Sequence, residues 1–234
     1  MKVAVATVAY REARLLPKFL QHIPDWVDTK LLLLSTKPWY GDVVPDDGTA
    51  DIASSGGAIT IAYDWKTEAD QRNAGQQYLS DYDWIIWLDP DEFLDDKGWD
   101  NLHKFLELST ANALIVERQR VFWKDHQEVE PHADYKQLIA VKPGVQFTEG
   151  RVVDSAYQEA PVTLFHFSWA RTDDEVRNKI SHYTHAPEFD TEKWFNEVWK
   201  ANKTENLHPK DPEVLQSLIP AELPTELEQL ELWP

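Results

Sequence analysis

The feature that most constrains the fold is an apolar segment that ends abruptly in acids. Residues 84–88 read Trp-Ile-Ile-Trp-Leu, followed by Asp89, Pro90, Asp91 and Glu92. A short, bulky and partly β-branched run of this kind is typical of a strand buried on both faces. Because an unpaired carboxylate is costly to bury, the acids belong where the strand leaves the core. Pro90 favours an extended chain at Asp89 and ends the strand's hydrogen bonding.

Asp89 and Asp91 are spaced so that they can act together. Residues two apart in an extended chain project from one face, and two carboxylates on one face repel each other unless a cation lies between them. Divalent cations that prefer oxygen ligands suit such a pair. Because the pattern is short, an acidic turn that binds no metal is the alternative interpretation.

Upstream of this segment, strand and helix patterns alternate. Strand patterns cover residues 3–8, 30–36, 58–63 and 84–88, and helical spacing covers 12–22, 51–55 and 68–79. This order predicts an α/β fold with a mostly parallel central sheet flanked by helices. Ligands of such sheets bind beyond the carboxyl ends of the strands. That rule places residues 10–12, the loop at 37–48 and the acids at 89–92 along one edge.

The second half of the chain is less regular. Helices are predicted over 99–108, 173–184 and 195–199, and strands over 113–123, 138–141, 145–147 and 162–167. We therefore expect one domain over residues 1–203 with a mixed second half. Residues 204–234 form an acidic, proline-containing tail, which either packs as short turns and helices or is mobile.

The composition indicates a globular protein and argues against several partners. Of the 234 residues, 42% are hydrophobic and 27% are charged, which suits one domain with a real core. The net charge of −18 opposes extensive binding to duplex nucleic acid or to anionic membranes. No apolar run approaches the ~20 residues of a membrane span, and because a strand pattern begins at residue 3, we expect no signal peptide before it. With no cysteine in the chain, we expect a cytoplasmic protein without disulfides or thiolate chemistry.

Four motifs follow one another along residues 3–95. They are Val-Ala-Thr-Val-Ala-Tyr-Arg-Glu at 5–12, Asp-Asp-Gly-Thr-Ala-Asp at 46–51, Arg-Asn-Ala-Gly at 72–75 and Asp-Pro-Asp at 89–91. Each motif is weak alone, but their order and spacing resemble glycosyltransferases with the GT-A fold, most closely the family-two type. The resemblance implies a Rossmann-like sheet with a nucleotide-binding half at about 1–95 and an acceptor and lid half at about 96–203.

The same resemblance implies an enzyme that moves a sugar, a hexose or a pentose, from a nucleoside diphosphate, with a UDP-sugar as the expected donor. Tyr10 and Glu12 belong to the motif that contacts the nucleoside, and Asp47 belongs to the segment that reads the base. In the family that segment usually follows the second strand directly, whereas here residues 35–41 intervene. Residues 35–37 are therefore the alternative to the Asp-Asp pair in that role.

The diphosphate and a divalent metal are assigned to the later motifs. By resemblance, Asp89 and Asp91 would hold Mn²⁺ or Mg²⁺, which stabilises the negative charge of a leaving nucleoside diphosphate. Arg72 would add a nearby charge that can pair with phosphate. Its alternative role is a salt bridge to Glu68 or Asp70.

His166, Arg177 and Lys179 resemble the late histidine and the basic lid of such enzymes. His166 ends the apolar run 162–165, so it is expected at a strand end as a third metal ligand, and its imidazole favours manganese. Arg177 and Lys179 would close over the diphosphate. The alternatives are a structural histidine and a solvated helix face.

The catalytic base and the acceptor are less defined. An inverting transfer needs a carboxylate near the acceptor hydroxyl. Besides Asp91, Glu149 and Asp154 are the candidate catalytic acids, with Glu159 in the same region. Since no spacing selects one, inverting and retaining transfer both stay open, as do saccharide, protein, lipid and modified nucleobase as acceptors.

Two rival functions remain. A nucleotidyltransferase would also use acids to hold a metal, but it favours a Gly-rich basic loop after the first strand, where this chain has Tyr10, Arg11 and Glu12. A non-catalytic sugar- or nucleotide-binding module is the other rival, and it would carry a degenerate site.

Overall fold

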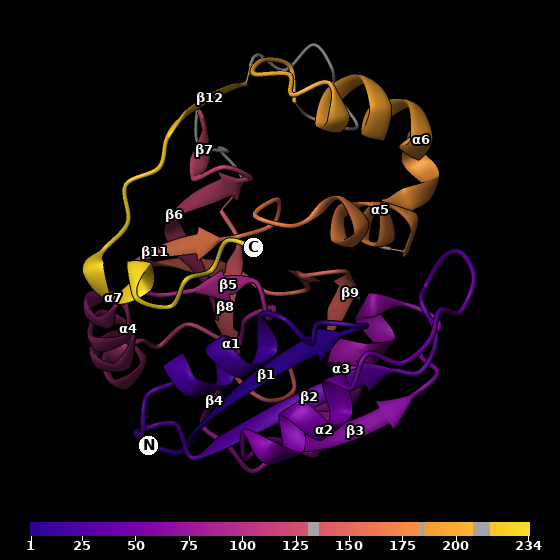
Figure 1. Ribbon diagram of the computed structural model, residues 1–234. Coiled ribbons are helices and arrows are strands. Elements are labelled where there is room, and N and C mark those ends of the chain that lie inside the picture. Colours follow the sequence, from indigo (N-terminus) through magenta and orange to yellow (C-terminus); the bar gives the residue numbers. More distant parts are fainter. Residues whose placement is uncertain (131–135, 183–184, 208–215) are drawn as a thin grey trace.

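The chain folds around one sheet whose first four strands are parallel (Figure 1). The computed structural model describes residues 1–130, 136–182, 185–207 and 216–234. The four strands lie in the order β3-β2-β1-β4 and comprise Val3–Ala9 (β1), Thr29–Ser35 (β2), Ile59–Tyr63 (β3) and Trp84–Trp87 (β4). Their carboxyl ends therefore meet at one edge of the sheet, and the predicted α/β architecture is confirmed.

The second half of the chain extends this sheet with mixed pairing. One strand, β8, lies antiparallel to both β4 and β6, while β11 lies parallel to β6 and antiparallel to β5. The bounds are Glu92–Phe93 (β5), Ala113–Trp123 (β6), Gln127–Glu130 (β7), Leu138–Val141 (β8), Tyr157–His166 (β11) and Ser217–Pro220 (β12). A separate hairpin consists of Phe147–Glu149 (β9) and Val152–Val153 (β10).

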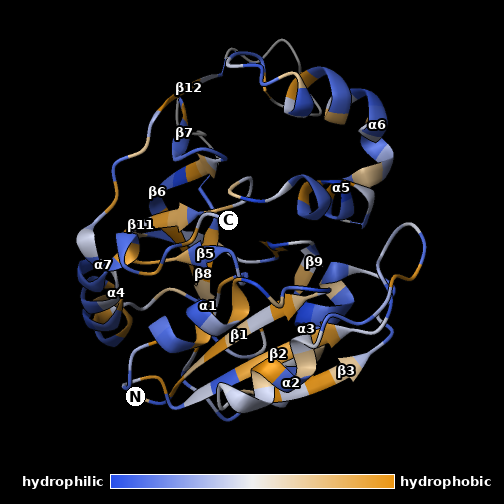
Figure 2. Cartoon of the chain, viewed as in Figure 1, coloured by the Kyte–Doolittle hydropathy of each residue, from blue (hydrophilic) through white to orange (hydrophobic). Residues whose placement is uncertain are grey.

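Helices cover both faces of the sheet, and the hydropathy colouring in Figure 2 shows the apolar strands between them. One apolar cluster joins one face to α1, α2, α4 and α7, and a second joins the opposite face to α3 and the β9–β10 hairpin. A third cluster packs α5 and α6 against the end of β6. The helices are Leu16–His22 (α1), Thr49–Ser55 (α2), Glu68–Tyr78 (α3), Asp96–Leu108 (α4), Asp173–His182 (α5), Thr191–Trp194 (α6) and Thr225–Glu228 (α7), with a 3₁₀ turn at Ala186–Glu188 and a π-helical turn at Phe195–Lys200.

Helix α3 lies unusually close to the sheet at Gly75. A Cβ atom built on Gly75 would lie 2.7 Å from a methyl carbon of Leu33 and 2.8 Å from the indole of Trp87. Only a residue without a side chain permits that approach, which explains the glycine of the Arg-Asn-Ala-Gly motif. The contact fixes α3 over the end of β4, one turn away from Arg72.

Several predicted boundaries shift for local reasons. The helix expected from residue 12 begins at Leu16, because Arg11 adopts a left-handed conformation with φ of 59° and the chain turns before it coils. The helix expected from residue 99 begins at Asp96, since the carboxylate of Asp95 caps it by accepting from the N–H of Gly98. The last two residues of the helix predicted over 173–184 lie outside the described residues.

The C-terminal segment 216–234 packs against the rest of the chain. Strand β12 pairs with β7, and Leu232 has no exposure to solvent. The Trp233 ring contacts Phe122 and Phe167, and its indole N–H donates to the carbonyl of Trp123. Of the two alternatives for the tail, packing therefore holds for this segment. Across the described residues, no helix has both the length and the apolar character that crossing a membrane requires.

Candidate active site

The acids that follow β4 are brought to His166 by a strand that sequence patterns did not predict. After Asp91 the chain forms β5, which pairs antiparallel with the end of β11 and places Glu92 opposite His166. The N–H of Phe167 donates to the carbonyl of Asp91 at 2.7 Å. In Figure 1 the arrowheads of β1 to β3 point toward the side on which β9 and α5 lie, which is the edge where ligands of parallel sheets bind.

Asp91 lies at the centre of a buried cluster of charges and is 4% exposed. Its Oδ2 accepts from the Arg171 guanidinium at 2.7 Å and from the Lys179 ammonium at 2.9 Å. Its Oδ1 lies 3.4 Å from Nε2 of His166. Burial alone would raise the pKa of Asp91, but its interactions with Lys179, His166 and Arg171 hold that pKa well below its usual range.

Asp89 is the more accessible acid, with 29% of its side chain exposed. Its Oδ1 accepts from Nη2 of Arg72 at 3.0 Å, and its Oδ2 lies 3.7 Å from Nη1 of Arg151. Burial acts to raise its pKa, yet these two guanidinium charges lower it overall. Asp89 is therefore ionised, and part of its side chain is exposed to solvent.

Arg72 has no exposed surface. Its Nε and Nη2 donate to the Glu68 carboxylate at 2.9 and 2.6 Å, and its guanidinium lies 5.3 Å from the Trp87 ring and 5.9 Å from the Phe147 ring. The predicted alternative, a salt bridge to Glu68, is thus present, and the same group also holds Asp89. As the side chain lies here, it supports the acid rather than facing the solvent side where a diphosphate would approach.

Arg151 is a site residue that sequence patterns missed. It follows Gly150 in the β9–β10 hairpin, donates to both oxygens of Glu92, at 2.5 and 2.7 Å, and also bonds the carbonyl of Trp87. Burial opposes its charge, but Glu92 and Asp89 raise the pKa of Arg151 above its usual range. Since Glu92 also accepts from the N–H of Asp89 at 2.8 Å, this pair fixes the turn that presents both aspartates. The only signal in the sequence was a lone arginine after a glycine in a region of short strands.

Glu12 joins the same cluster from the end of β1. Its carboxylate accepts from Arg171 at 3.1 to 3.3 Å, so one guanidinium bridges Glu12 and Asp91. Burial raises the pKa of Glu12 more than the Arg171 charge lowers it. Conversely, although burial opposes its charge, Glu12 and Asp91 raise the pKa of Arg171 above its usual range.

Tyr10 and Asp47 tie the loop after β2 to the turn after β1. The Tyr10 hydroxyl accepts from the N–H of Val44 at 3.1 Å. Asp47 accepts from the N–H of Ala13 at 3.1 Å and from the Thr49 hydroxyl at 2.5 Å. These contacts hold the loop after β2 against the turn after β1, where both nucleoside-contacting candidates lie.

Three predicted site residues lie apart from this cluster. Arg177 pairs with Glu192 at 2.5 Å and lies 4.2 Å above the Phe195 ring, on the other side of α5 from Lys179. Glu149 and Asp154 are exposed on the β9–β10 hairpin; among the described residues, neither is a partner of Asp89 or Asp91.

Asp91 and His166 are spaced as two ligands of a divalent metal could be, although the described residues contain no preformed group of three His, Cys, Asp or Glu ligands. Oδ2 of Asp91 is engaged by two cations, which leaves Oδ1 facing His166. The separation of 3.4 Å between Oδ1 and Nε2 is near the ~3.0 Å between neighbouring ligands in an octahedral shell of radius about 2.1 Å. Two carboxylates and one imidazole suit manganese or magnesium.

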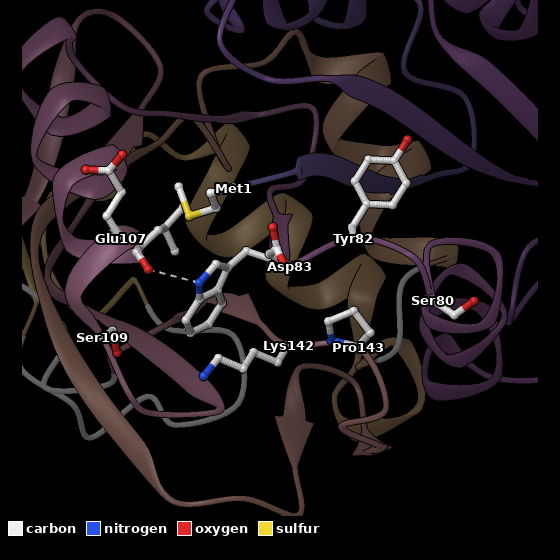
Figure 3. Close-up of a pocket in the computed structure, with 10 residues that line it drawn as sticks. Met1, Ser80, Tyr82, Asp83, Glu107, Ser109, Lys142 and Pro143 are labelled. Carbon is white, nitrogen blue, oxygen red and sulfur yellow. Dashed lines mark hydrogen bonds between the residues drawn. The ribbon is translucent and has the colours of Figure 1, made fainter.

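A cavity of about 620 Å³ lies elsewhere, and Figure 3 shows the residues that line it. They include Met1, Asp83, Trp84 and Lys142. Because Trp84 begins β4 and Asp89 follows its end, this cavity lies at the opposite edge of the sheet from the charged cluster.

Comparison with known proteins supports the fold. No protein-family model matches the chain. A TPR repeat-containing protein of Synechococcus elongatus is 27% identical over 146 residues, which are 62% of this chain and 33% of that protein. A mannosyltransferase from Pyrobaculum calidifontis, solved with GDP-Man and Mn²⁺, aligns with a TM-score of 0.51 at 13% identity over 81% of this chain and 65% of that one. A cytidylyltransferase from Leptospira borgpetersenii aligns with a TM-score of 0.45 at 14% identity, over 86% of this chain and 94% of that one.

The chain thus matches a third of the length of the Synechococcus protein and 65% of the mannosyltransferase. Sequence identity this low supports an inference about the fold alone. The strand order, the mixed second half and the likeness to the mannosyltransferase all indicate the same fold. This protein has a GT-A-like fold with a cluster of paired charges at the carboxyl ends of its parallel strands.

Proposed function

We propose that this protein is a metal-dependent glycosyltransferase that moves a sugar from a nucleoside diphosphate, with a UDP-sugar as the donor. One observation carries the proposal. Asp89 and Asp91 follow the central strand β4 at the edge where ligands of parallel sheets bind. His166 lies 3.4 Å from Asp91, on β11, which pairs with β5 directly after these acids.

In this proposal Asp89, Asp91 and His166 hold Mn²⁺ or Mg²⁺. The bound ion would supply stabilisation of the negative charge that develops on the leaving nucleoside diphosphate. The nucleoside would lie between the turn after β1, which carries Tyr10 and Glu12, and the loop after β2, which carries Asp47.

The basic side chains in and around the site would have different roles. Arg171, buried and bonded to Glu12 and Asp91, holds the two acids in place. Lys179 has 19% of its side chain exposed, so its ammonium can turn from Asp91 to a phosphate oxygen. Arg72 acts through Asp89, and Arg177 reaches a diphosphate only if α5 changes its orientation.

The acceptor hydroxyl needs a base in an inverting transfer. Glu149 and Asp154 are the proposed candidates, since their hairpin also carries Arg151, 3.7 Å from Asp89. Loss of transfer in Glu149→Gln or Asp154→Asn, with donor binding retained, would select one of them. The acceptor class stays open among a saccharide, a protein, a lipid and a modified nucleobase, and we place the reaction in the cytoplasm.

The test is isothermal titration with UDP and other nucleoside diphosphates, with manganese and with chelator, together with hydrolysis assays on a panel of sugar nucleotides. We expect metal-dependent UDP binding that is lost in Asp91→Ala and weakened in His166→Ala, while both variants stay folded. Binding of a nucleoside triphosphate with pyrophosphate release would instead indicate a nucleotidyltransferase. Binding without hydrolysis or transfer on any donor would indicate a non-catalytic module.

A further inference from the structure

Gln119 is a buried polar residue that contacts the proposed metal ligand. It lies on β6, is 7% exposed, and its Nε2 lies 2.9 Å from Nδ1 of His166. In the parallel register of β6 and β11, Gln119 lies opposite Leu164 and Val121 lies opposite His166. The side chains of Gln119 and His166 therefore project from the same face of the sheet.

Both nitrogens of the His166 ring face polar side chains. Nδ1 faces the Gln119 amide at 2.9 Å, and Nε2 faces Oδ1 of Asp91 at 3.4 Å. A neutral imidazole has one donor and one acceptor nitrogen. With the Gln119 amide donating to Nδ1, the proton lies on Nε2 and points at Asp91. In that tautomer Nε2 has no lone pair to offer a metal.

We propose that Gln119 is a positioning residue that sets the tautomer of His166 and so controls its entry into the metal shell. The inference rests on the proposed function. When the Gln119 amide turns to present its oxygen, that oxygen accepts a hydrogen bond from Nδ1–H and leaves Nε2 free to bind. The proton leaves Nε2 and another arrives at Nδ1 through solvent, so the charge of the ring is unchanged.

The amide of Gln119 can serve both states. Its NH₂ group donates to Nδ1 when His166 is turned to Asp91, and its oxygen accepts from Nδ1–H when a metal is bound. A carboxylate at this position would accept only, and an apolar side chain would do neither. Partners that orient a ligating imidazole typically change metal affinity by about 10- to 100-fold when removed.

The experiment compares wild type with Gln119→Met and Gln119→Glu. Long-range ¹H–¹⁵N spectra of protein with labelled histidine report which ring nitrogen carries the proton, without metal and with magnesium. Manganese affinity is measured by titration calorimetry, and thermal unfolding checks that each variant is folded. Gln137→Glu is the matched control. With the amide group in the orientation that satisfies its hydrogen bonds, the Gln137 oxygen accepts from Nε of Arg151 at 3.0 Å, so the substitution adds the same charge near the site but away from His166.

We expect the proton of wild-type His166 on Nε2 without metal and on Nδ1 with magnesium. Gln119→Glu should show Nδ1–H in both conditions and bind manganese more tightly than Gln137→Glu does. Gln119→Met should bind manganese about 10- to 100-fold more weakly than wild type. The same tautomer and the same affinity in wild type and in both Gln119 variants would overturn the inference alone. A wild-type protein that binds no manganese would overturn the proposed metal site and the inference with it.

Discussion

Arg72 donates to Asp89 across 3.0 Å although its own side chain has no exposure to solvent. The guanidinium is enclosed by Trp87 and Phe147 and also bonds Glu68. It is therefore a fixed positive charge behind the acid that faces the ligand edge. Removing that charge should affect both the stability of the fold and the charge balance of the site.

Arg72→Ala should lower the free energy of unfolding by about 3 kcal/mol. This is the low end of the range for removing one partner of a buried ion pair, because Asp89 and Glu68 keep some exposure. Urea unfolding measures the change, and Gln77→Ala, exposed on the same helix, is the control and should change stability by less than about 0.5 kcal/mol. A stability equal to wild type would mean that Arg72 contributes nothing to the fold.

The regular half of the fold could be read from the sequence because its signals are local. The apolar runs at 3–8, 30–36 and 84–88 each form strands that share one buried sheet, and helix 68–79 lies where its spacing predicts. The two-residue strand β5 was not predictable. It is too short to have a period, and only its pairing with β11 holds it in place.

The site was less predictable than the fold for the same reason. Asp89 and Asp91 stand next to the strand that presents them, so their position follows from the sequence. The pairing of Arg151 with Glu92 and the contact of Gln119 with His166 join segments 59 and 47 residues apart. No local pattern marks such partners, because the fold alone brings them together.

Gly75→Ala should destabilise the fold even though alanine favours helices. The added Cβ would lie 2.8 Å from Trp87 and 2.7 Å from Leu33, so α3 must move away from the sheet. Overpacking of this kind costs about 1–3 kcal/mol, against a helix propensity gain of about 1 kcal/mol. Thermal unfolding measures the balance, and a higher melting temperature in the variant would show that the approach of α3 is not tight.

The stability of the protein should depend on pH through Asp91. Its folded pKa is held well below the ordinary value by Lys179, His166 and Arg171 despite burial, whereas the unfolded value is near ~3.9. Between these values the folded state binds fewer protons than the unfolded state, so stability rises with pH. The contribution is complete above about pH 5 and is lost as the pH falls toward the folded pKa.

Asp91→Asn should therefore show a smaller loss of stability than wild type between about pH 5 and pH 3. Urea midpoints across that range measure it, with Asp81→Asn, an exposed aspartate, as the control for removing one carboxylate. The two proteins must be compared by how steeply their stability changes with pH. Burial raises the pKa of Glu12 and Glu92, so these two acids make stability fall as the pH rises, in the opposite direction to Asp91. Parallel curves for wild type and Asp91→Asn would contradict the prediction.

Lys179 and Arg177 should differ in their effect on donor binding, although both lie on α5 two residues apart. Residues two apart on a helix point about 200° away from each other, so only one of them faces the charged cluster. Lys179 bonds Asp91 and the Ser168 hydroxyl, both at 2.9 Å, whereas Arg177 pairs with Glu192 on the exposed side. In the proposed function, Lys179 rather than Arg177 would therefore pass from an aspartate to a phosphate.

Lys179→Met should weaken UDP binding by roughly 10- to 100-fold, which corresponds to the ~1.5–3 kcal/mol of a hydrogen bond to a charged group. Arg177→Met removes the same charge from the same helix and should change stability by no more than about 0.5 kcal/mol. Its effect on UDP binding should be much smaller than that of Lys179→Met. Calorimetric titration of both variants at two salt concentrations separates a direct contact from the general field of the helix, because only the field is screened strongly by salt. Equal losses that persist at high salt would mean that α5 turns on binding and that Arg177 also reaches the diphosphate.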